Sequence, residues 1–340
     1  MPGTVFVTDP THTAHLLPRH PERPERLEAI VAQLEARGLR QRMDERAPRE
    51  ATEAELLTVH QPALLATIER VATRRGPLDP DTYAMPESPA IARRAAGALL
   101  VAVEAVLAGE CTNGFVATRP PGHHATPDRA MGFCLYNSIA IAATAALRSG
   151  VERLAIVDWD VHHGNGTQDV FRDDPRVLYV STHAAPFYPG TGEVHEVGAG
   201  AAHGTNVNIP LPHGTGDAGF LAAWERVGVP ALERHRPQLV LVSSGWDAHA
   251  RDPLGTLNVT TEGYTRAARL VRDAAARLCD GRLVATLEGG YDTHALAWCA
   301  SALVELLLGD EPTPDPDPAA VPAGDPLDAR IAEVRAAIGL

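Results

Sequence analysis

The chain has 340 residues, 45% of them hydrophobic, and a formal net charge of −13 at pH 7. That hydrophobic fraction can bury a large core, and the acidic excess without a Lys/Arg-rich stripe argues against sequence-independent nucleic-acid binding. No apolar run is long and uncharged enough to cross a bilayer, and the N-terminus lacks a signal-like pattern. The 4 cysteines show no CxxC pairing, which is typical of reduced thiols. We therefore expect a cytoplasmic protein without membrane contact.

Helical and strand signals alternate along the chain. Apolar periodicity with capping features predicts helices over residues 22–37, 62–74, 88–107, 136–147, 218–234, 262–278 and 293–308. Short apolar runs between them predict strands that begin at Gly114, Leu154, Val177, Val207, Leu239 and Leu283. Because these runs are apolar on both faces, they favour a parallel sheet covered by helices on both sides. We therefore expect one open, three-layer α/β domain over residues 1–309.

The end of the chain has a different composition. Prolines in residues 310–326, DEPTPDPDPAAVPAGDP, exclude a helix or a strand ladder and predict an extended acidic linker. Residues 327–340 then carry an apolar stripe, which predicts a short helix packed on the body or on a neighbouring subunit. The sequence is thus compatible with a monomer or a homodimer.

Polar clusters follow five of the predicted strands, and ligands bind beyond the carboxyl ends of strands in an open parallel sheet. The clusters are RPPGHHA, DWDVHHGNG, HAAPFYPGTG, GWDAHARDP and GGY. Asp160 and His162 stand two apart on extended backbone, so their side chains point the same way and can reach one ion. Asp247, from another strand end, would complete a set of two carboxylates and one imidazole. Such a set is typical of a catalytic metal, with Zn(II) as the first choice and Fe(II) or Co(II) as alternatives.

The remaining polar residues suit amide hydrolysis. A bound metal lowers the pKa of its water towards ~7 and polarises a carbonyl. The reaction also needs a base for the water, an acid for the leaving amine and a donor for the oxyanion. His123 and His124 of RPPGHHA can supply the first two, and the hydroxyl of Tyr291 can supply the third.

Taken together, these pieces resemble a known family. They are, in order, HPERPERL from His20, the VH at Val59 and His60, RPPGHHA, MGFCLYNSIAIAA, DWDVHHGNGTQDVF, PFYPGTGE, SSGWDAHARDPLG and LEGGYD. Their order and combination are similar to the zinc-dependent histone deacetylase and acetylpolyamine amidohydrolase family, with the arginase/deacetylase fold. The resemblance extends from about Val5 to Leu308 and implies a mostly parallel sheet of about eight strands.

The resemblance also implies a role for each matching residue. The metal ligands would be Asp160, His162 and Asp247. The catalytic residues would be His124 as base and acid, His123 as its electrostatic partner, Asp158 to orient His123, and Tyr291 to bind the substrate carbonyl. A structural potassium ion would lie at Asp158, Asp160, His162, Ser181 and Thr182, and a second monovalent site near Phe171 and Val177. The substrate tunnel would include Gly132, Phe133, Tyr188, Leu254 and Gly290.

Some positions distinguish this chain within the family. Asn165 stands where some members carry aspartate, as in class II-like enzymes, so His124 should be a neutral base near pH 7. Tyr291 is present where weakly active relatives carry histidine. Leu254 replaces the glutamate of polyamine-selective animal relatives, which removes one argument for polyamines without excluding them. Gly164 ends the D-x-H motif where two-manganese ureohydrolases have a further aspartate, so one metal fits better than two.

These observations predict a mononuclear metal deacetylase. The first substrate hypothesis is an acyl-lysine peptide or protein, and the alternative is a small acylated amine such as an acetylpolyamine. A third hypothesis is a catalytically idle protein that binds acyl-lysine or a metabolite. The complete set of ligands, tandem histidines and tyrosine argues against that third hypothesis.

Overall fold

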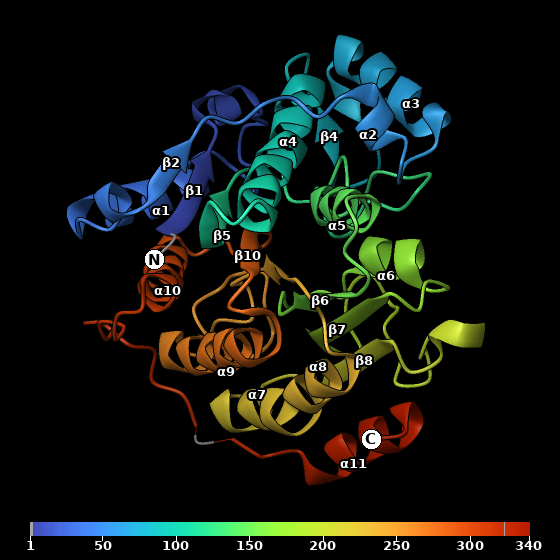
Figure 1. The fold of residues 1–340 in the computed structure, drawn as a ribbon. Coiled ribbons are helices and arrows are strands. Elements are labelled where there is room, and N and C mark those ends of the chain that lie inside the picture. The colour runs from blue at the N-terminus through green and yellow to red at the C-terminus, as the bar shows by residue number, and fades with distance from the viewer. Residues whose placement is uncertain (1–2, 323) are drawn as a thin grey trace.

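The structure is a computed structural model that describes residues 3–322 and 324–340. In this part of the chain an eight-stranded sheet has the order β2-β1-β5-β10-β9-β6-β7-β8, and all neighbouring strands are parallel (Figure 1). Its strands are β1 (Gly3–Thr8), β2 (Asp44–Arg46), β5 (Cys111–Ala117), β6 (Leu154–Asp158), β7 (Val177–Ala184), β8 (Asn206–Leu211), β9 (Val240–Ser244) and β10 (Leu283–Leu287). A separate antiparallel pair joins β3 (Gly76–Pro77) to β4 (Tyr83–Ala84). The predicted open parallel sheet is confirmed.

Helices cover both faces of the sheet and enclose two cores. Successive strand residues alternate between the cores, as Phe115 and Val116 do, which explains why the strand runs are apolar throughout. One core is covered by α1 (Glu25–Ala36), α7 (Asp217–Ala223), η4 (Trp224–Gly228), α8 (Val229–His235), α9 (Thr261–Cys279), α10 (Thr293–Leu308) and α11 (Asp328–Ile338). The other is covered by α2 (Glu53–Leu56), α3 (Pro62–Arg74), α4 (Ser88–Leu107), α5 (Ser138–Arg148) and α6 (Asn165–Phe171). Short 3-10 turns are η1 (Pro10–Ala14), η2 (Arg40–Arg42) and η3 (Gly200–Ala202).

One predicted helix is divided in the structure. Residues 218–234 form α7, the π-helical turn η4 and α8 instead of a single α-helix. Pro230 has no backbone N–H to donate to the carbonyl of Arg226, four residues earlier, which removes one helical hydrogen bond. That carbonyl instead accepts a hydrogen bond of 2.5 Å from Nη1 of Arg335 in α11. The division of the helix therefore provides a contact for the C-terminal helix.

Helix α11 lies against the body of the protein. Its buried side chains are Ile331, Val334 and Ile338, and it contacts β8 and η4. Residues 309–322, which follow α10, run along the outside of the molecule (Figure 1).

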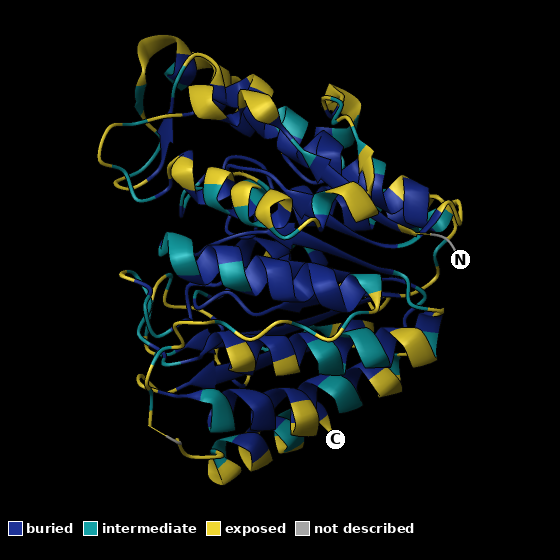
Figure 2. Ribbon diagram, turned by 90° about the vertical axis from the view of Figure 1, so that its left-hand side faces the viewer, coloured by how far each residue is buried: buried dark blue, intermediate teal, exposed yellow. Residues whose placement is uncertain are grey.

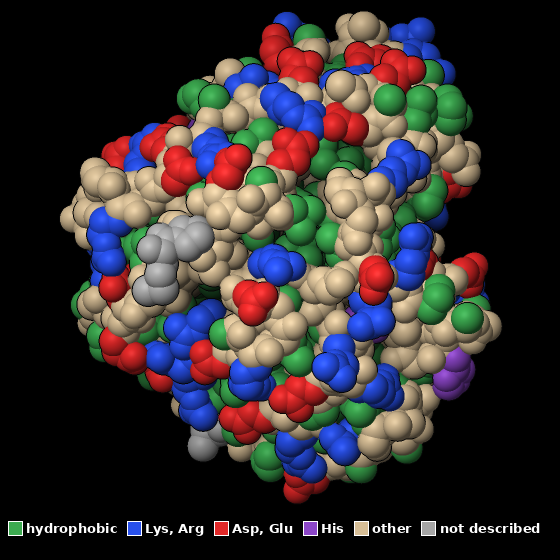
Figure 3. All heavy atoms as spheres, in the orientation of Figure 1, with side chains coloured by type: hydrophobic (Ala, Val, Ile, Leu, Met, Phe, Trp, Pro, Cys, Tyr) green, Lys and Arg blue, Asp and Glu red, His purple; other side chains and the backbone are tan. Residues whose placement is uncertain are grey.

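The surface is polar and mixed in charge. Figure 2 shows exposed residues on the outer sides of the helices and buried residues on the sides that face the sheet. On the face seen in Figure 3, basic and acidic side chains are interspersed. Among the described residues, no helix combines the length and apolar composition of a membrane span.

Candidate active site

Asp160, His162 and Asp247 come together in the loops that follow β6 and β9. Nδ1 of His162 lies 3.1 Å from Oδ1 of Asp160 and 3.1 Å from Oδ2 of Asp247. One ligand atom from each residue lies within 4.8 Å of the others, and both carboxylates are buried. Among the described residues, this is the group of His, Cys, Asp or Glu side chains whose spacing suits a metal ion.

The electrostatics of the three residues also suit a cation. Burial raises the pKa of Asp247 and the neighbouring charge of Asp160 raises it further, to about 7. Burial alone would lower the pKa of His162, but hydrogen bonds to Asp160 and Asp247 raise it to about 10. Two buried carboxylates that repel each other and hold positive charge between them form a donor set that fits a divalent metal.

Close backbone approach fixes the two carboxylates. A Cβ atom on Gly289 would lie 2.1 Å from Oδ2 of Asp247, and one on Gly245 would lie 2.1 Å from Oδ2 of Asp160. The amide of Gly289 donates to Oδ2 of Asp160 at 2.8 Å, and the amide of Val161 donates to Oδ1 of Asp247 at 2.8 Å. The loops after β6, β9 and β10 therefore depend on glycine to enclose this donor set.

The tandem histidines lie in different electrostatic environments although their ring centroids are 4.0 Å apart. Nδ1 of His123 lies 3.0 Å from Oδ2 of Asp158, whereas Nδ1 of His124 lies 2.8 Å from Oδ1 of Asn165. Burial alone would lower the pKa of His123, but the carboxylates of Asp160, Asp158 and Glu288 raise it to about 10. Burial and the positive charges on His123 and His162 keep the pKa of His124 well below its usual value. His123 thus carries a proton near neutral pH, and His124 is free to accept one.

Glu288 holds the turn that carries these histidines, a role that the sequence analysis missed. Its Oε2 accepts hydrogen bonds from the amides of Gly122, at 2.7 Å, and His123, at 3.2 Å. Its Oε1 accepts one from the hydroxyl of Ser243 at 3.0 Å. The signal available in the sequence was a glutamate at the end of an apolar strand, in LEGGYD.

Tyr291 lies beside the metal-ligating set and is 8% exposed. Its amide donates to Oδ2 of Asp252 at 2.6 Å, and the guanidinium of Arg26 lies 4.7 Å from the centre of its ring. Burial holds the pKa of the phenol well above its usual value, so the hydroxyl keeps its proton and can donate a hydrogen bond. Asp252, like Glu288, positions the site through the backbone and was not predicted.

A cavity of about 260 Å³ joins these groups. Of the predicted residues, it is lined by His123, His124, Gly132, Phe133, Asp160, His162, Tyr188, Leu254 and Tyr291. Residues that the sequence analysis did not predict, Asp81, Pro121, Phe187 and Gly289, complete the lining. Two residues predicted for the tunnel or the metal site do not line the cavity: Gly290, whose carbonyl accepts a hydrogen bond from Arg26, and Asp247, which belongs to the donor set.

Aromatic rings form the walls of this cavity. Phe133 meets Tyr291 edge to face at 5.8 Å between ring centroids, and Tyr188 meets His124 edge to face at 5.2 Å. Phe187 stacks on His162 at 5.1 Å. Gly132 has a φ of 56°, and a Cβ there would lie 2.4 Å from the ring of His124. Only glycine therefore allows the backbone to pass this close to the histidine.

Of the five residues expected to hold potassium, Asp158, Asp160, Ser181 and Thr182 are buried and His162 is partly buried. The hydroxyl of Tyr179 donates to Oδ2 of Asp158 at 3.0 Å, and Ser181 contacts His183 at 2.9 Å. The buried hydroxyl of Thr182 has no hydrogen-bond partner. Phe171 and Val177, expected near a second monovalent site, are the last residue of α6 and the first residue of β7, the strand that follows it.

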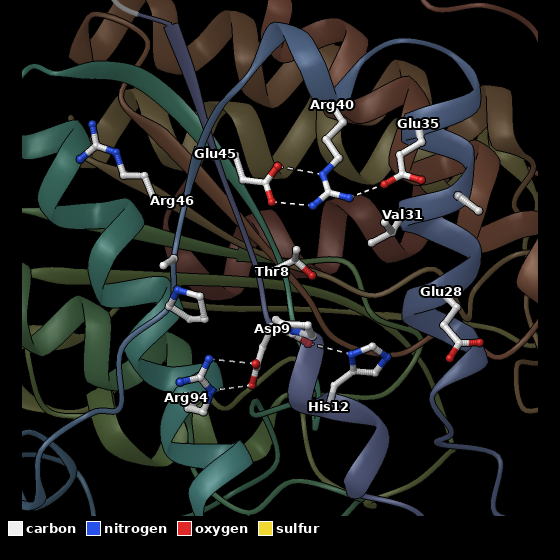
Figure 4. A pocket seen from close by; sticks show the side chains of 14 residues that line it. Thr8, Asp9, His12, Glu28, Val31, Glu35, Arg40, Glu45, Arg46 and Arg94 are labelled. Atoms are coloured by element: carbon white, nitrogen blue, oxygen red, sulfur yellow. Dashed lines mark hydrogen bonds and ion pairs between the residues drawn. The ribbon is translucent and has the colours of Figure 1, made fainter.

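A larger cavity, of about 640 Å³, lies away from these groups, beyond the end of β1 between α1 and α4 (Figure 4). Five of its charged side chains are paired with one another. Arg94 binds Asp9 with two contacts of 3.0 Å, and Arg40 binds both Glu35 and Glu45. Volume alone is therefore a poor guide here, because the smaller cavity holds the tandem histidines and two of the three candidate metal ligands.

Comparison with known proteins agrees with the geometry of this site. Residues 20–307 match the histone deacetylase domain. The chain belongs to the histone deacetylase family. A probable deacetylase of Archaeoglobus fulgidus is 41% identical over 295 residues, which cover 86% of this chain and 82% of that protein. A histone deacetylase-like amidohydrolase of Pseudomonas aeruginosa is 42% identical over 295 residues, 85% of this chain and 77% of that protein.

Two further relatives define the family membership more closely. The human polyamine deacetylase HDAC10 is 41% identical over 308 residues, which cover 86% of this chain and 45% of that protein. The crystal structure of the HDA15 HD domain superposes with a TM-score of 0.88 at 35% identity, over 100% of this chain and 94% of that one. The arginase/deacetylase-like fold is thus confirmed, and the protein is a deacetylase, a hydrolase of amide bonds, as the sequence predicts.

Proposed function

We propose that the protein is a zinc-dependent deacetylase that removes acetyl or other acyl groups from lysine side chains. The observation that supports this most directly is that a neutral histidine and a protonated tyrosine line one cavity with two members of a three-ligand donor set, while the third, Asp247, lies next to them. Asp160, His162 and Asp247 would hold the ion, with Fe(II) or Co(II) as alternatives. When bound there, a zinc ion would lower the pKa of water towards ~7 and polarise the acyl carbonyl.

The residues of the chain then divide the proton transfers between them. His124 takes a proton from the attacking water at Nε2, because its Nδ1 is held by Asn165. A bond forms between the water oxygen and the acyl carbon, and the hydroxyl of Tyr291 donates to the oxyanion that develops. The carbon–nitrogen bond then breaks, and His124 returns its proton to the leaving amine. His123, held by Asp158, keeps its own proton throughout and stabilises negative charge in the site.

The cavity walls suit a linear chain that ends in an acyl amide. Phe133 and Tyr188 offer flat apolar surfaces, and Leu254 adds an aliphatic one. Asp81 places a carboxylate at the same cavity, which suits a cationic substrate. A small acylated amine such as an acetylpolyamine is the second candidate, since the polyamine deacetylase HDAC10 is 41% identical. We also propose a structural potassium ion at Asp158, Asp160, His162, Ser181 and Thr182, and a cytoplasmic monomer or homodimer without nucleic-acid or membrane partners.

Acetate release by the zinc-loaded protein tests this function. An acetyl-lysine peptide and a monoacetylated diamine are compared under the same conditions. We expect a higher kcat/KM for the peptide. A preference for the diamine would assign the enzyme to metabolite substrates, and no release of acetate or a longer acyl group from either would restore the idle binding protein as the better hypothesis.

A further inference from the structure

The acidic segment that follows α10 is bound to the body of the protein at several points. It lies beyond residue 307, where the match to the histone deacetylase domain ends. Its contacts are Asp310 with Arg42, Glu311 with Arg269, Thr313 with Glu305, Asp315 with His294 and Thr261, and Asp317 with Arg251. The segment therefore follows a fixed path over α9 and α10.

Asp315 is the most deeply held residue of this segment. Its side chain is 2% exposed, although most of its neighbours in the segment are exposed. Oδ1 of Asp315 lies 3.0 Å from Nε2 of His294, and Oδ2 accepts a hydrogen bond of 3.0 Å from the hydroxyl of Thr261. Burial alone would raise the pKa of this carboxyl, but the hydrogen bonds from Asp317, His294 and Thr261 lower it. Asp315 is therefore an ionised carboxylate that joins the first turns of α9 and α10.

His294, one of these partners, stands in the first turn of α10, directly after the loop of Tyr291. Asp292 caps that helix by accepting a hydrogen bond of 2.8 Å from the amide of Ala295. The contact between Asp315 and His294 thus fixes the helix end that immediately follows the tyrosine.

Asp317 holds the other side of the same loop. Nη2 of Arg251 lies 2.7 Å from both the carbonyl oxygen and a carboxylate oxygen of Asp317. Asp252, which follows Arg251 in the sequence, accepts hydrogen bonds from the amides of Tyr291, at 2.6 Å, and Asp292, at 3.2 Å. Residues 315–317 therefore contact both segments that hold the backbone of Tyr291. One is the first turn of α10, and the other is the loop of Arg251 and Asp252.

We propose that residues 315–317 form a clamp that positions the Tyr291 hydroxyl in the active site, with Asp315 and Asp317 as positioning residues. This inference rests on the proposed role of Tyr291 as the oxyanion donor. A hydrogen bond to an oxyanion depends steeply on geometry, and a misplacement of about 1 Å can cost about 100-fold in rate. The clamp lies outside the cavity and its printed contacts include none of the metal ligands, so its loss leaves the metal ligands in place.

The variant Asp315→Ala tests the clamp, with Glu311→Ala as the matched control. Glu311 belongs to the same segment but contacts Arg269 on α9, away from the Tyr291 loop. We expect Asp315→Ala to lower kcat about tenfold, a moderate displacement by the same geometric rule, with unchanged KM and metal content. Glu311→Ala should leave kcat unchanged. Arg251→Gln, which removes the contact with Asp317, should lower kcat in the same way and provides an independent variant if Asp315→Ala does not fold.

A double-mutant comparison separates positioning from a general structural role. In a Tyr291→Phe background the hydroxyl is absent, so Asp315→Ala should cause no further loss of kcat. Equal losses in the two backgrounds, or a normal kcat for both Asp315→Ala and Arg251→Gln, would overturn the clamp. A near-normal kcat for Tyr291→Phe alone would instead overturn the proposed role of the tyrosine.

Discussion

Two buried charged clusters lie near Tyr291, and the pKa values of their carboxylates shift in opposite directions. In the first, Glu22 is bound by Arg119, at 2.7 and 2.5 Å, and by Arg26, at 3.1 Å. Burial raises the pKa of Glu22, but the two guanidinium groups lower it to about 2. In the second, burial and Asp160 raise the pKa of Asp247 to about 7.

The difference lies in whether the protein itself supplies the balancing charge. Glu22, Arg26 and Arg119 are each about 0% exposed, and the remaining donors of the two arginines bind backbone carbonyls, among them those of Gly290 and His12. The carboxylate and guanidinium groups of this cluster are therefore bound by other protein groups, and the role of the cluster is to stabilise the fold. The cluster of Asp160 and Asp247 keeps an excess of negative charge next to an open cavity, which is what a site for a cation requires.

Removal of a ligand from the second cluster should have the largest effect on activity. Asp247→Ala leaves two side chains to hold the ion, so we expect loss of bound zinc and of measurable acetate release. Metal content by atomic emission, measured together with turnover, checks this. Glu35→Gln, at an exposed ion pair far from the site, is the control. A fully metallated, active Asp247→Ala variant would contradict the ligand assignment.

A change in the first cluster should instead affect stability. Glu22→Gln leaves the buried guanidinium groups of Arg26 and Arg119 without a counter-charge, which costs about 3–5 kcal/mol in the free energy of unfolding. Denaturant titration measures this cost. The Glu35→Gln control breaks an exposed pair with Arg40, and its cost should stay below about 1 kcal/mol. Equal losses in the free energy of unfolding for the two variants would mean that the buried cluster stabilises the fold no more than an exposed ion pair does.

Tyr291 contacts both clusters' surroundings: its ring lies 4.7 Å from the guanidinium of Arg26, and it lines the cavity together with Asp160 and His162. Tyr291→Phe keeps the ring and its contact with Arg26 but removes the oxyanion donor, so we expect kcat to fall by about 10²–10³-fold. Zinc content and the unfolding midpoint should stay close to those of the unchanged protein. Steady-state kinetics with an acetyl-lysine peptide give the answer, and near-normal turnover would exclude the tyrosine from the reaction.

The two clusters differ in how visible they are in the sequence. Asp160 and His162 follow a buried strand at a spacing of two, so their common direction could be predicted from local geometry. Glu22 and Arg119 lie 97 residues apart, and no local pattern shows that they meet. Asp252 and Glu288 act by accepting hydrogen bonds from backbone amides, a role that depends on how loops fold and not on periodicity.

The fold shows the same limit of local sequence patterns. The helices over residues 62–74, 88–107 and 293–308 have the predicted bounds, because a proline marks the first turn of the first two and Asp292 caps the third. The predicted strands included neither β1, Gly3–Thr8, nor β2, Asp44–Arg46. Strand β2 was missed because its three residues are charged and it pairs only with β1 at the edge of the sheet. An edge strand needs no apolar pattern on both faces, so composition does not reveal it.

The first cluster, of Glu22, Arg26 and Arg119, also predicts how the free energy of unfolding depends on pH. The pKa of Glu22 is about 2 in the folded protein and 4.5 for an ordinary glutamate. A lowered folded pKa contributes stability that is fully present above the unfolded value and is lost as the pH falls from about 4.5 towards 2, here about 3 kcal/mol. Unfolding free energies at pH 6, 4 and 3 should therefore fall more steeply for the unchanged protein than for Glu22→Gln, whose side chain does not titrate. Parallel pH profiles for the two proteins would show that the arginines do not hold Glu22 in its ionised form.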